Sequence, residues 1–129
     1  MHNLFRALLR YGSDKDVLIL RLGLAAVLLY AGIRILIEPL NWLGFVPQWI
    51  EVVMPREVFL KSHALFEIGL GIGILSGAWL PLLSAIAFLD FVSILIFFGI
   101  DDITFRDIGL ACMALALFLR AFSKGQQRE

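Results

Sequence analysis

The fold is decided by residues 61–100, which read KSHALFEIGLGIGILSGAWLPLLSAIAFLDFVSILIFFGI. The short connection Trp79-Leu80-Pro81 separates two apolar blocks, and Pro81 suits the first turn of a helix. Each block approaches the roughly 20 residues that a helix needs to cross the hydrocarbon core of a membrane. The stretch therefore predicts an antiparallel hairpin of two membrane-spanning helices.

Two further apolar blocks flank this hairpin and complete a pattern of four membrane spans. The first block ends near Glu38, because Pro39 disfavours the helical conformation of the residue before it. We do not expect this block to be a signal peptide, because it is longer than a signal h-region and no small-residue cleavage pattern follows it. We expect a single transmembrane domain over residues 1–129, with spans at 17–37, 61–78, 81–100 and 104–122.

The composition indicates that a lipid bilayer surrounds this chain. Of its 129 residues 60% are hydrophobic and 17% are charged, whereas a soluble domain is about half apolar and a quarter charged. The 11 basic and 11 acidic side chains cancel, which argues against nucleic acid as a partner, because that needs clustered lysine and arginine. The single cysteine, Cys112, excludes an internal disulfide and a cysteine-rich metal site, and we expect it to be buried packing.

Two segments outside the spans are expected at the membrane surface. Residues 2–12 place apolar side chains at helical spacing beside two arginines, which is typical of a short interfacial amphipathic helix; a frayed N-terminus is the alternative. The first connection, residues 38–60, holds Trp42 and Trp49 between prolines. Because indole rings favour the headgroup region, we expect an interfacial cap with one helical turn on the mouth of the bundle.

The distribution of basic residues predicts the orientation of the chain. Six lysines and arginines lie before the first span or at the end of the fourth, against three in the connections on the opposite side. Since short cytoplasmic loops carry the excess of basic residues, we expect both termini in the cytoplasm. Insertion in both orientations is the alternative.

Several ionisable side chains fall inside the predicted spans, where each costs roughly 2.5 to 3.5 kcal/mol near the centre. A rise of about 1.5 Å per residue puts Asp90 at the membrane midplane and Glu67 within roughly 3 Å of it. His63 and Glu67 are four residues apart and share a helix face, so they can form an acid-base pair. The residues that we expect to converge in the outer half of the bundle, or at its midplane, are Arg34, His63, Glu67, Asp90, Arg106 and Asp107.

Two interpretations of these polar residues stay open. In the first, they line a cavity. The catalytic candidates for moving protons are then Glu67, Asp90 and His63, and the substrate-binding candidates are Arg34, Glu67, Arg106 and Asp107. In the second, they only neutralise one another, with Arg34 as the counterion of Glu67 or Asp107. Asp90 is either a proton relay with Glu67 or a neutral acid bonded to the backbone. We expect no metal site.

These features resemble the DoxX family of small bacterial and archaeal membrane proteins. The resemblance covers roughly residues 16–120. The family's first span commonly closes with lysine where this chain has Arg34, which keeps the charge. The motifs that carry it are, in order, Arg21-Leu22-Gly23, then Gly32 with Arg34, then Glu67 followed by GLGIG, then Arg106-Asp107-Ile108-Gly109-Leu110.

The resemblance implies a four-helix bundle in the prokaryotic cytoplasmic (inner) membrane and a role in a quinone-linked oxidoreductase system, since relatives include parts of thiosulfate:quinone oxidoreductase. It implies no intrinsic cofactor, only quinone as a ligand, and it implies other membrane or redox subunits as partners; a homo-oligomer is also open. Whether the chain is itself an enzyme stays open. The alternatives are a non-catalytic accessory subunit and, less favoured, a small-solute or weak-acid transporter. The phenylalanines of the third span face lipid, fill the bundle or stack on a quinone: Phe88, Phe91, Phe97 and Phe98.

Overall fold

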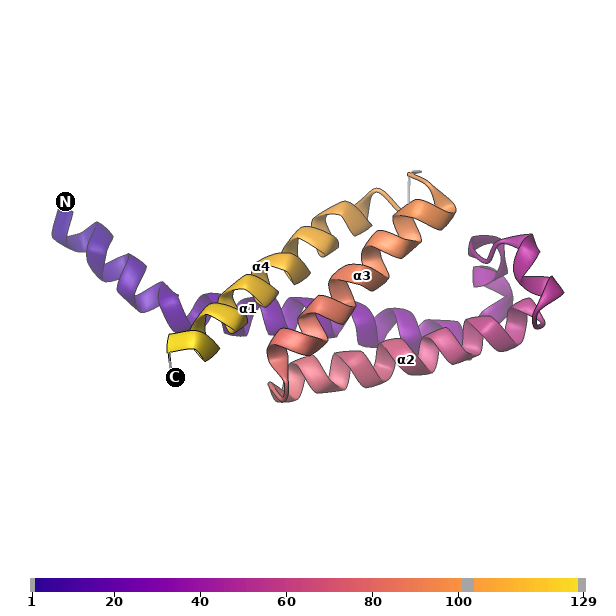
Figure 1. The fold of residues 1–129 in the computed structure, drawn as a ribbon, viewed down its shortest axis with the longest axis horizontal. Coiled ribbons are helices and arrows are strands. Elements are labelled where there is room, and N and C mark those ends of the chain that lie inside the picture. Colours follow the sequence, from indigo (N-terminus) through magenta and orange to yellow (C-terminus); the bar gives the residue numbers. More distant parts are fainter. Residues whose placement is uncertain (1, 101–103, 128–129) are drawn as a thin grey trace.

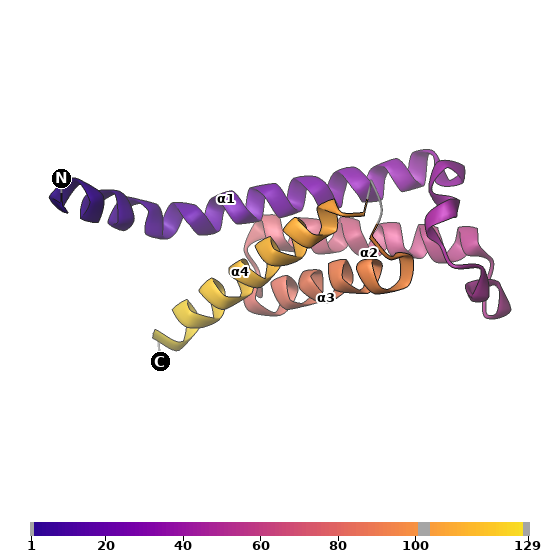
Figure 2. The same cartoon turned by 90° about the horizontal axis from the view of Figure 1, so that it is seen from above.

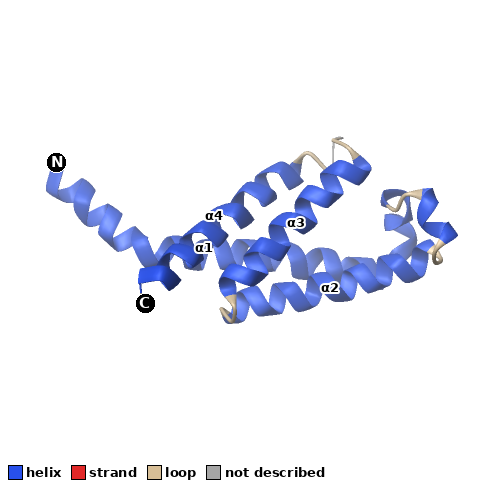
Figure 3. Cartoon of the chain, in the orientation of Figure 1, coloured by secondary structure: helices blue, strands red, loops and turns tan. Residues whose placement is uncertain are grey.

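The computed structural model describes residues 2–100 and 104–127, and this part of the chain contains helices and turns but no strand (Figure 3). Two short 3₁₀ helices, η1 (Pro39–Phe45) and η2 (Gln48–Val52), follow the first long helix. The four α-helices are α1 (His2–Ile37), α2 (Arg56–Ser76), α3 (Leu80–Phe98) and α4 (Arg106–Gln127).

Three helices within the described ranges are long and apolar enough to cross a membrane, over Lys15–Ile37, Arg56–Ser76 and Leu80–Phe97. They carry large apolar side chains on their outward surfaces, such as Ile19 and Leu89, which are more than half exposed. Such surfaces are suited to contact with lipid. The prediction of an all-helical chain with candidate membrane-spanning helices is confirmed for the described residues. The predicted fourth span falls on α4, which is helical but is not among these three.

The helices are arranged as two antiparallel pairs, α1 with α2 and α3 with α4 (Figure 1). The pairs are joined where α2 ends at Gly77, which has a left-handed backbone with φ of 81°. Here the Arg21 guanidinium of α1 donates hydrogen bonds to the carbonyl oxygens of Ile74 at 3.1 Å and Leu75 at 2.6 Å. Because the last carbonyls of a helix lack partners within the helix, Arg21 fixes α1 to the end of α2.

From this joint the α3–α4 pair diverges from the α1–α2 pair towards η1 and η2, as Figure 1 shows. Buried apolar residues fill the region where the pairs converge, among them Leu28, Ile74 and Leu117. A second apolar cluster, which includes Ile35 and Ile50, attaches the 3₁₀ helices to the ends of α1 and α2. The first connection therefore packs on the ends of α1 and α2 and contains two 3₁₀ helices where one turn was expected, while its place at the membrane surface stays a prediction.

Several predicted boundaries differ from the structure. Residues 2–12 do not form a separate interfacial helix but continue into the first span as part of α1 (Figure 2). The helix can run without a break because no proline precedes Pro39 and a glycine within a helix lowers its stability by only about 1 kcal/mol. The helix α2 begins at Arg56, five residues earlier than expected, because Pro55 precedes its first turn and the Glu57–Lys61 ion pair (3.1 Å) supports it.

The C-terminal part of the chain also departs from expectation. The fourth span was expected to end at residue 122, but α4 continues to Gln127, and residues 128–129 lie outside the described ranges. Cys112, expected to be buried, is exposed on α4. Adjacent positions of a helix point in different directions, so Cys112 is exposed although its neighbour Ala111 is buried, and the apolar neighbours in the sequence did not decide its position.

Gly32 marks a close approach of α1 to α2. A Cβ atom at this position would lie 2.6 Å from Cγ1 of Ile68 and 2.8 Å from the backbone oxygen of Ala64. Small residues permit such close packing of helices in lipid, where van der Waals contact drives helix association.

We expect Gly32→Ala to lower the stability of the detergent-purified protein by roughly 1 to 3 kcal/mol, the usual cost of an overpacked contact. The backbone of α2 would have to move to admit the methyl group. Gly69→Ala is the matched control on α2, because a Cβ at Gly69 meets no atom within 4 Å. Thermal unfolding followed by circular dichroism measures both variants. Equal unfolding temperatures would contradict the α1–α2 packing described.

Candidate functional site

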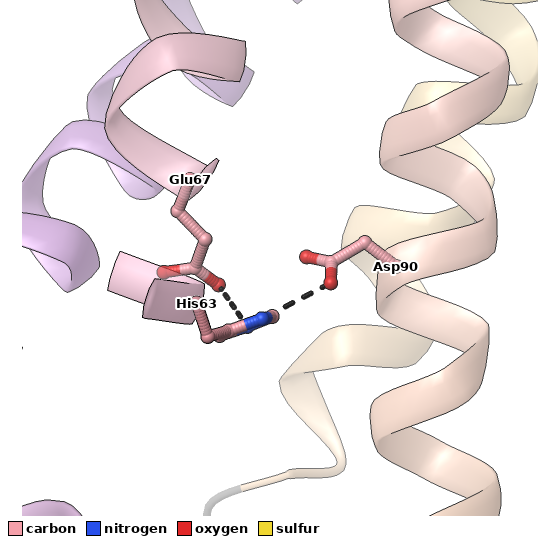
Figure 4. Close-up of side chains that lie close together, drawn as sticks. All are labelled: His63, Glu67 and Asp90. Atoms are coloured by element: carbon pink, nitrogen blue, oxygen red, sulfur yellow. Dashed lines mark hydrogen bonds and ion pairs between the residues drawn. The ribbon is translucent and has the colours of Figure 1, made fainter. Parts of the chain in front are cut away.

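Two of the predicted site residues form a pair on α2. His63 and Glu67 lie one turn apart, and His63 Nε2 is 3.0 Å from Glu67 Oε1 (Figure 4). The predicted acid-base pair is therefore present. The His63 ring also stacks on Phe59, with ring centroids 6.3 Å apart and planes 8° from parallel. This contact, together with the hydrogen bond to Glu67, orients the imidazole.

Asp90 of α3 reaches the same histidine from the other helix pair. Its Oδ1 atom lies 3.7 Å from His63 Nε2, and Figure 4 shows His63 between the two carboxylates. We refer to these three residues as the His63–Glu67–Asp90 cluster. It is the point where a polar group of α2 meets one of α3 across the space between the pairs.

The two carboxylates of the cluster are buried and incompletely bonded. Glu67 is 5% exposed and Asp90 is 9% exposed. Glu67 Oε2 and Asp90 Oδ2 have no hydrogen-bond partner among the residues that the structure describes. Since a buried polar atom without a partner costs about 1 to 3 kcal/mol and a charged one costs more, the cluster is a place where a bound group would improve the energy.

The cluster lies in the wall of a large cavity between the two helix pairs. Its volume is about 1080 Å³, slightly above the range of about 300 to 1,000 Å³ that is typical of small-molecule sites. The predicted residues Arg106 and Asp107, at the start of α4, belong to the same lining. The rest of the wall is mainly apolar and aromatic, and includes Trp42, Phe45, Trp49, Phe91, Phe97, Leu110 and Met113.

Arg34, the remaining candidate, is placed elsewhere. Its guanidinium forms an ion pair with Glu38, four residues later in the chain, and Arg34 is not part of the cavity lining. The expected pairing with Glu67 or Asp107 is not what the structure shows. Because a residue pair spaced by four lies on one helix face, Glu38 is the nearer partner for an arginine in the last turn of α1. Asn41 also donates a hydrogen bond to Glu38, at 3.1 Å.

Sequence reasoning did not include two polar residues of the lining, Ser93 and Thr104. The Ser93 hydroxyl donates to the backbone oxygen of Asp90 at 2.7 Å, and the Thr104 hydroxyl donates to the backbone oxygen of Gly99 at 2.7 Å. The spacing of Ser93 three residues after Asp90 was the available signal, because it places both on one helix face. Trp49 was expected only at the membrane surface, but it also lines the cavity.

Two of the four phenylalanines of the third span, Phe91 and Phe97, belong to the cavity lining, and Phe91 is also part of the apolar core. The rings of Phe97 and Trp49 lie in the lining with their centroids 6.0 Å apart. Phe91, which follows Asp90 on α3, is buried. Tyr30, Trp49 and Phe97 are also largely exposed, so the cavity opens to the outside between the pairs. An elongated apolar ligand could therefore enter with its head inside and its tail outside.

The donor set of the cluster permits three kinds of interaction. The imidazole and the carboxylates can donate and accept hydrogen bonds, can share protons, and can offer one ligand atom each to a metal ion, with all three atoms within 4.8 Å of one another. Sequence reasoning predicted the first two kinds of interaction but expected no metal site.

Comparison of the chain with models of protein families, with curated proteins and with solved structures finds no match. The resemblance to the DoxX family therefore rests on the motifs of this chain alone and stays a prediction.

Proposed function

We propose that this protein binds a quinone in the cavity between its helix pairs and serves as a component of a quinone-linked membrane oxidoreductase system. The observation that carries the proposal is the combination of a large, mainly apolar cavity with the buried His63–Glu67–Asp90 cluster in its wall. Ligand sites of this kind have hydrophobic walls and a few polar groups that fix the orientation of the ligand.

The lining suits the parts of a quinone. The flat ring is apolar on its faces and would pack against Phe91, Phe97 and Trp49, while its two oxygens need hydrogen-bond partners. A quinone oxygen accepts hydrogen bonds, so the donor in the His63–Glu67–Asp90 cluster would be the His63 ring N–H or the protonated carboxyl group of Glu67 or Asp90, whose Oε2 and Oδ2 atoms have no other partner among the described residues. The opening at Tyr30 and Phe97 would let the isoprenoid tail extend into lipid.

The redox role requires a partner protein. A quinone takes up two electrons and two protons to become a quinol, and the sequence carries no recognisable haem, flavin or iron-sulfur motif. The electrons would therefore come from another subunit, and this chain would hold the quinone. This division of labour agrees with the small size of the chain and with its resemblance to the DoxX family, of which we propose that it is a divergent member.

The test is binding of a short-chain quinone to the detergent-purified protein after treatment with a metal chelator. We expect saturable binding that Glu67→Gln weakens about tenfold, equivalent to about 1.4 kcal/mol. Arg34→Gln is the matched control, because Arg34 is held by Glu38 away from the cavity. Absence of saturable binding, or equal affinities for the two variants, would contradict the proposal.

An accessory subunit without a ligand is the second candidate, and one observation favours it. Gly69 of α2 lies outside the cavity lining and leaves open space where a Cβ would be, and small residues are the usual contact points between helices in lipid. Native purification separates the candidates. Quinone in the lipid extract supports the first, and stoichiometric partner proteins without quinone support the second.

The proposed topology places all four helices across the inner membrane with both termini in the cytoplasm. We expect alkaline phosphatase fused after residue 129 to be inactive, and green fluorescent protein fused at the same position to fluoresce, when the fusions are expressed in bacteria. The reason is that α4 runs antiparallel to α3 along its length, so a crossing α3 returns the chain through α4 (Figure 1). An active phosphatase fusion would show that α4 does not cross.

A further inference from the structure

We propose that the His63–Glu67–Asp90 cluster is a binding site for one divalent transition-metal ion, with Zn²⁺ as the best fit. The site goes beyond the proposed function, since binding of a quinone does not require it. It rests on the identity, spacing and burial of three side chains that two helices bring together in the cavity wall.

The distances between the donor atoms match a metal coordination sphere. Zinc binds histidine nitrogen and carboxylate oxygen at about 2.0 to 2.2 Å, which puts two ligands of a tetrahedral site about 3.4 Å apart. His63 Nε2 is 3.0 Å from Glu67 Oε1 and 3.7 Å from Asp90 Oδ1, on either side of this value. All three atoms lie within 4.8 Å of one another, so the two carboxylates would close on the ion to reach tetrahedral spacing.

The charges of the cluster also match a divalent ion. Two carboxylates and a neutral imidazole carry a charge of −2, and burial of such a charge without compensation is costly. No arginine or lysine is paired with Glu67 or Asp90 among the ion pairs of the described residues. A divalent cation neutralises the cluster completely.

The unpartnered oxygens are an independent observation that points to a ligand. Glu67 Oε2 and Asp90 Oδ2 lack hydrogen-bond partners within the described ranges, on side chains that are more than nine-tenths buried. Carboxylates bind metals through one or both oxygens, so a bound ion would give these oxygens the partner that they lack. Figure 4 shows one Asp90 oxygen directed into the space that separates it from α2.

The donor types select the class of metal. Imidazole nitrogen suits Zn²⁺, Fe²⁺ and related first-row ions, whereas Mg²⁺ and Ca²⁺ prefer sites made of oxygen alone. Three protein ligands leave at least one coordination position open, as in catalytic zinc sites. Because all three residues line the cavity, this open position faces the space in which a ligand oxygen would lie.

The experiment is a titration of the chelator-stripped, detergent-purified protein with Zn²⁺, with an affinity tag that contains no histidine. We expect one ion per chain. Glu67→Gln and Asp90→Asn each remove one charged ligand with little change of shape, and we expect each to weaken Zn²⁺ binding at least about tenfold. Glu57→Gln is the matched control, since Glu57 lies on the same helix and pairs at the surface with Lys61.

A spectroscopic readout on the unmodified chain keeps the test independent of variant folding. Co²⁺ added in place of Zn²⁺ is expected to give visible absorption bands typical of four- or five-coordinate cobalt, which Zn²⁺ then displaces. The absence of stoichiometric binding, or equal Zn²⁺ affinity in Glu67→Gln, Asp90→Asn and Glu57→Gln, would overturn the proposal. Quinone binding is measured on protein from which metal has been removed by a chelator. The quinone proposal and the zinc proposal can therefore fail independently of each other.

Discussion

The Gly109→Trp variant is expected to fold normally and to lose quinone binding. Gly109 belongs to the cavity lining, and a Cβ atom there would meet no atom within 4 Å, so a large side chain has room to grow without displacing the helices. The indole would occupy the volume that the quinone ring needs. We expect a loss of affinity of roughly 100-fold or more, equivalent to about 2.7 kcal/mol.

Gly69→Trp is the matched control for this prediction. Gly69 also has open space around its Cβ position, but it is not part of the lining of the cavity. Both variants are compared by circular dichroism and by equilibrium dialysis with a short-chain quinone. Unchanged quinone affinity in Gly109→Trp would place the binding site outside the cavity.

The second large effect is the contribution of the His63–Glu67–Asp90 cluster to the stability of the protein. We expect His63→Leu alone to destabilise the protein by roughly 3 to 5 kcal/mol, because loss of one partner leaves buried carboxylates without compensation. Both Glu67 Oε1 and Asp90 Oδ1 face the His63 nitrogen. The single change therefore removes the group that separates them.

Replacement of the whole cluster should have the opposite effect. We expect the triple variant His63→Leu, Glu67→Met, Asp90→Leu to be at least as stable as the unmodified protein, because well-packed apolar side chains often replace buried ionic groups at a gain of about 1 to 4 kcal/mol. It should bind neither quinone nor Zn²⁺. Thermal unfolding of the three proteins in one detergent measures the effect. A triple variant as unstable as the single one would show that the cluster serves the fold.

Much of the helical architecture was predictable because its signals are local. Pro39 and Pro81 mark the end of one helix and the start of another, and the apolar blocks between such marks have the length of membrane spans. The tryptophans of the first connection indicated that this connection forms a cap on the mouth of the helix bundle. The hydrogen bonds of Arg21 to the end of α2, by contrast, depend on packing between helices and could not be predicted from local signals.

The site was predicted in its residues but not in its form. The spacing of four residues brought His63 and Glu67 together, and the estimated depth placed Asp90 near the level of Glu67, so their proximity follows from lengths alone. The partner of Arg34 was missed because Glu38 was treated as a residue beyond the span. The cavity was not predictable, because the divergence of the two pairs depends on helix rotation and on contacts such as Gly32 with α2.

Photolabelling tests the central claim most directly, because it reports where the ligand lies. A quinone that carries a photoreactive group on its ring is irradiated with the purified protein, and the labelled residues are mapped by mass spectrometry. We predict that the label falls on cavity residues such as Trp49, Phe97 and Met113 and is displaced by unlabelled quinone. Label spread over outward-facing residues such as Ile19 and Leu65, without displacement by unlabelled quinone, would contradict the account.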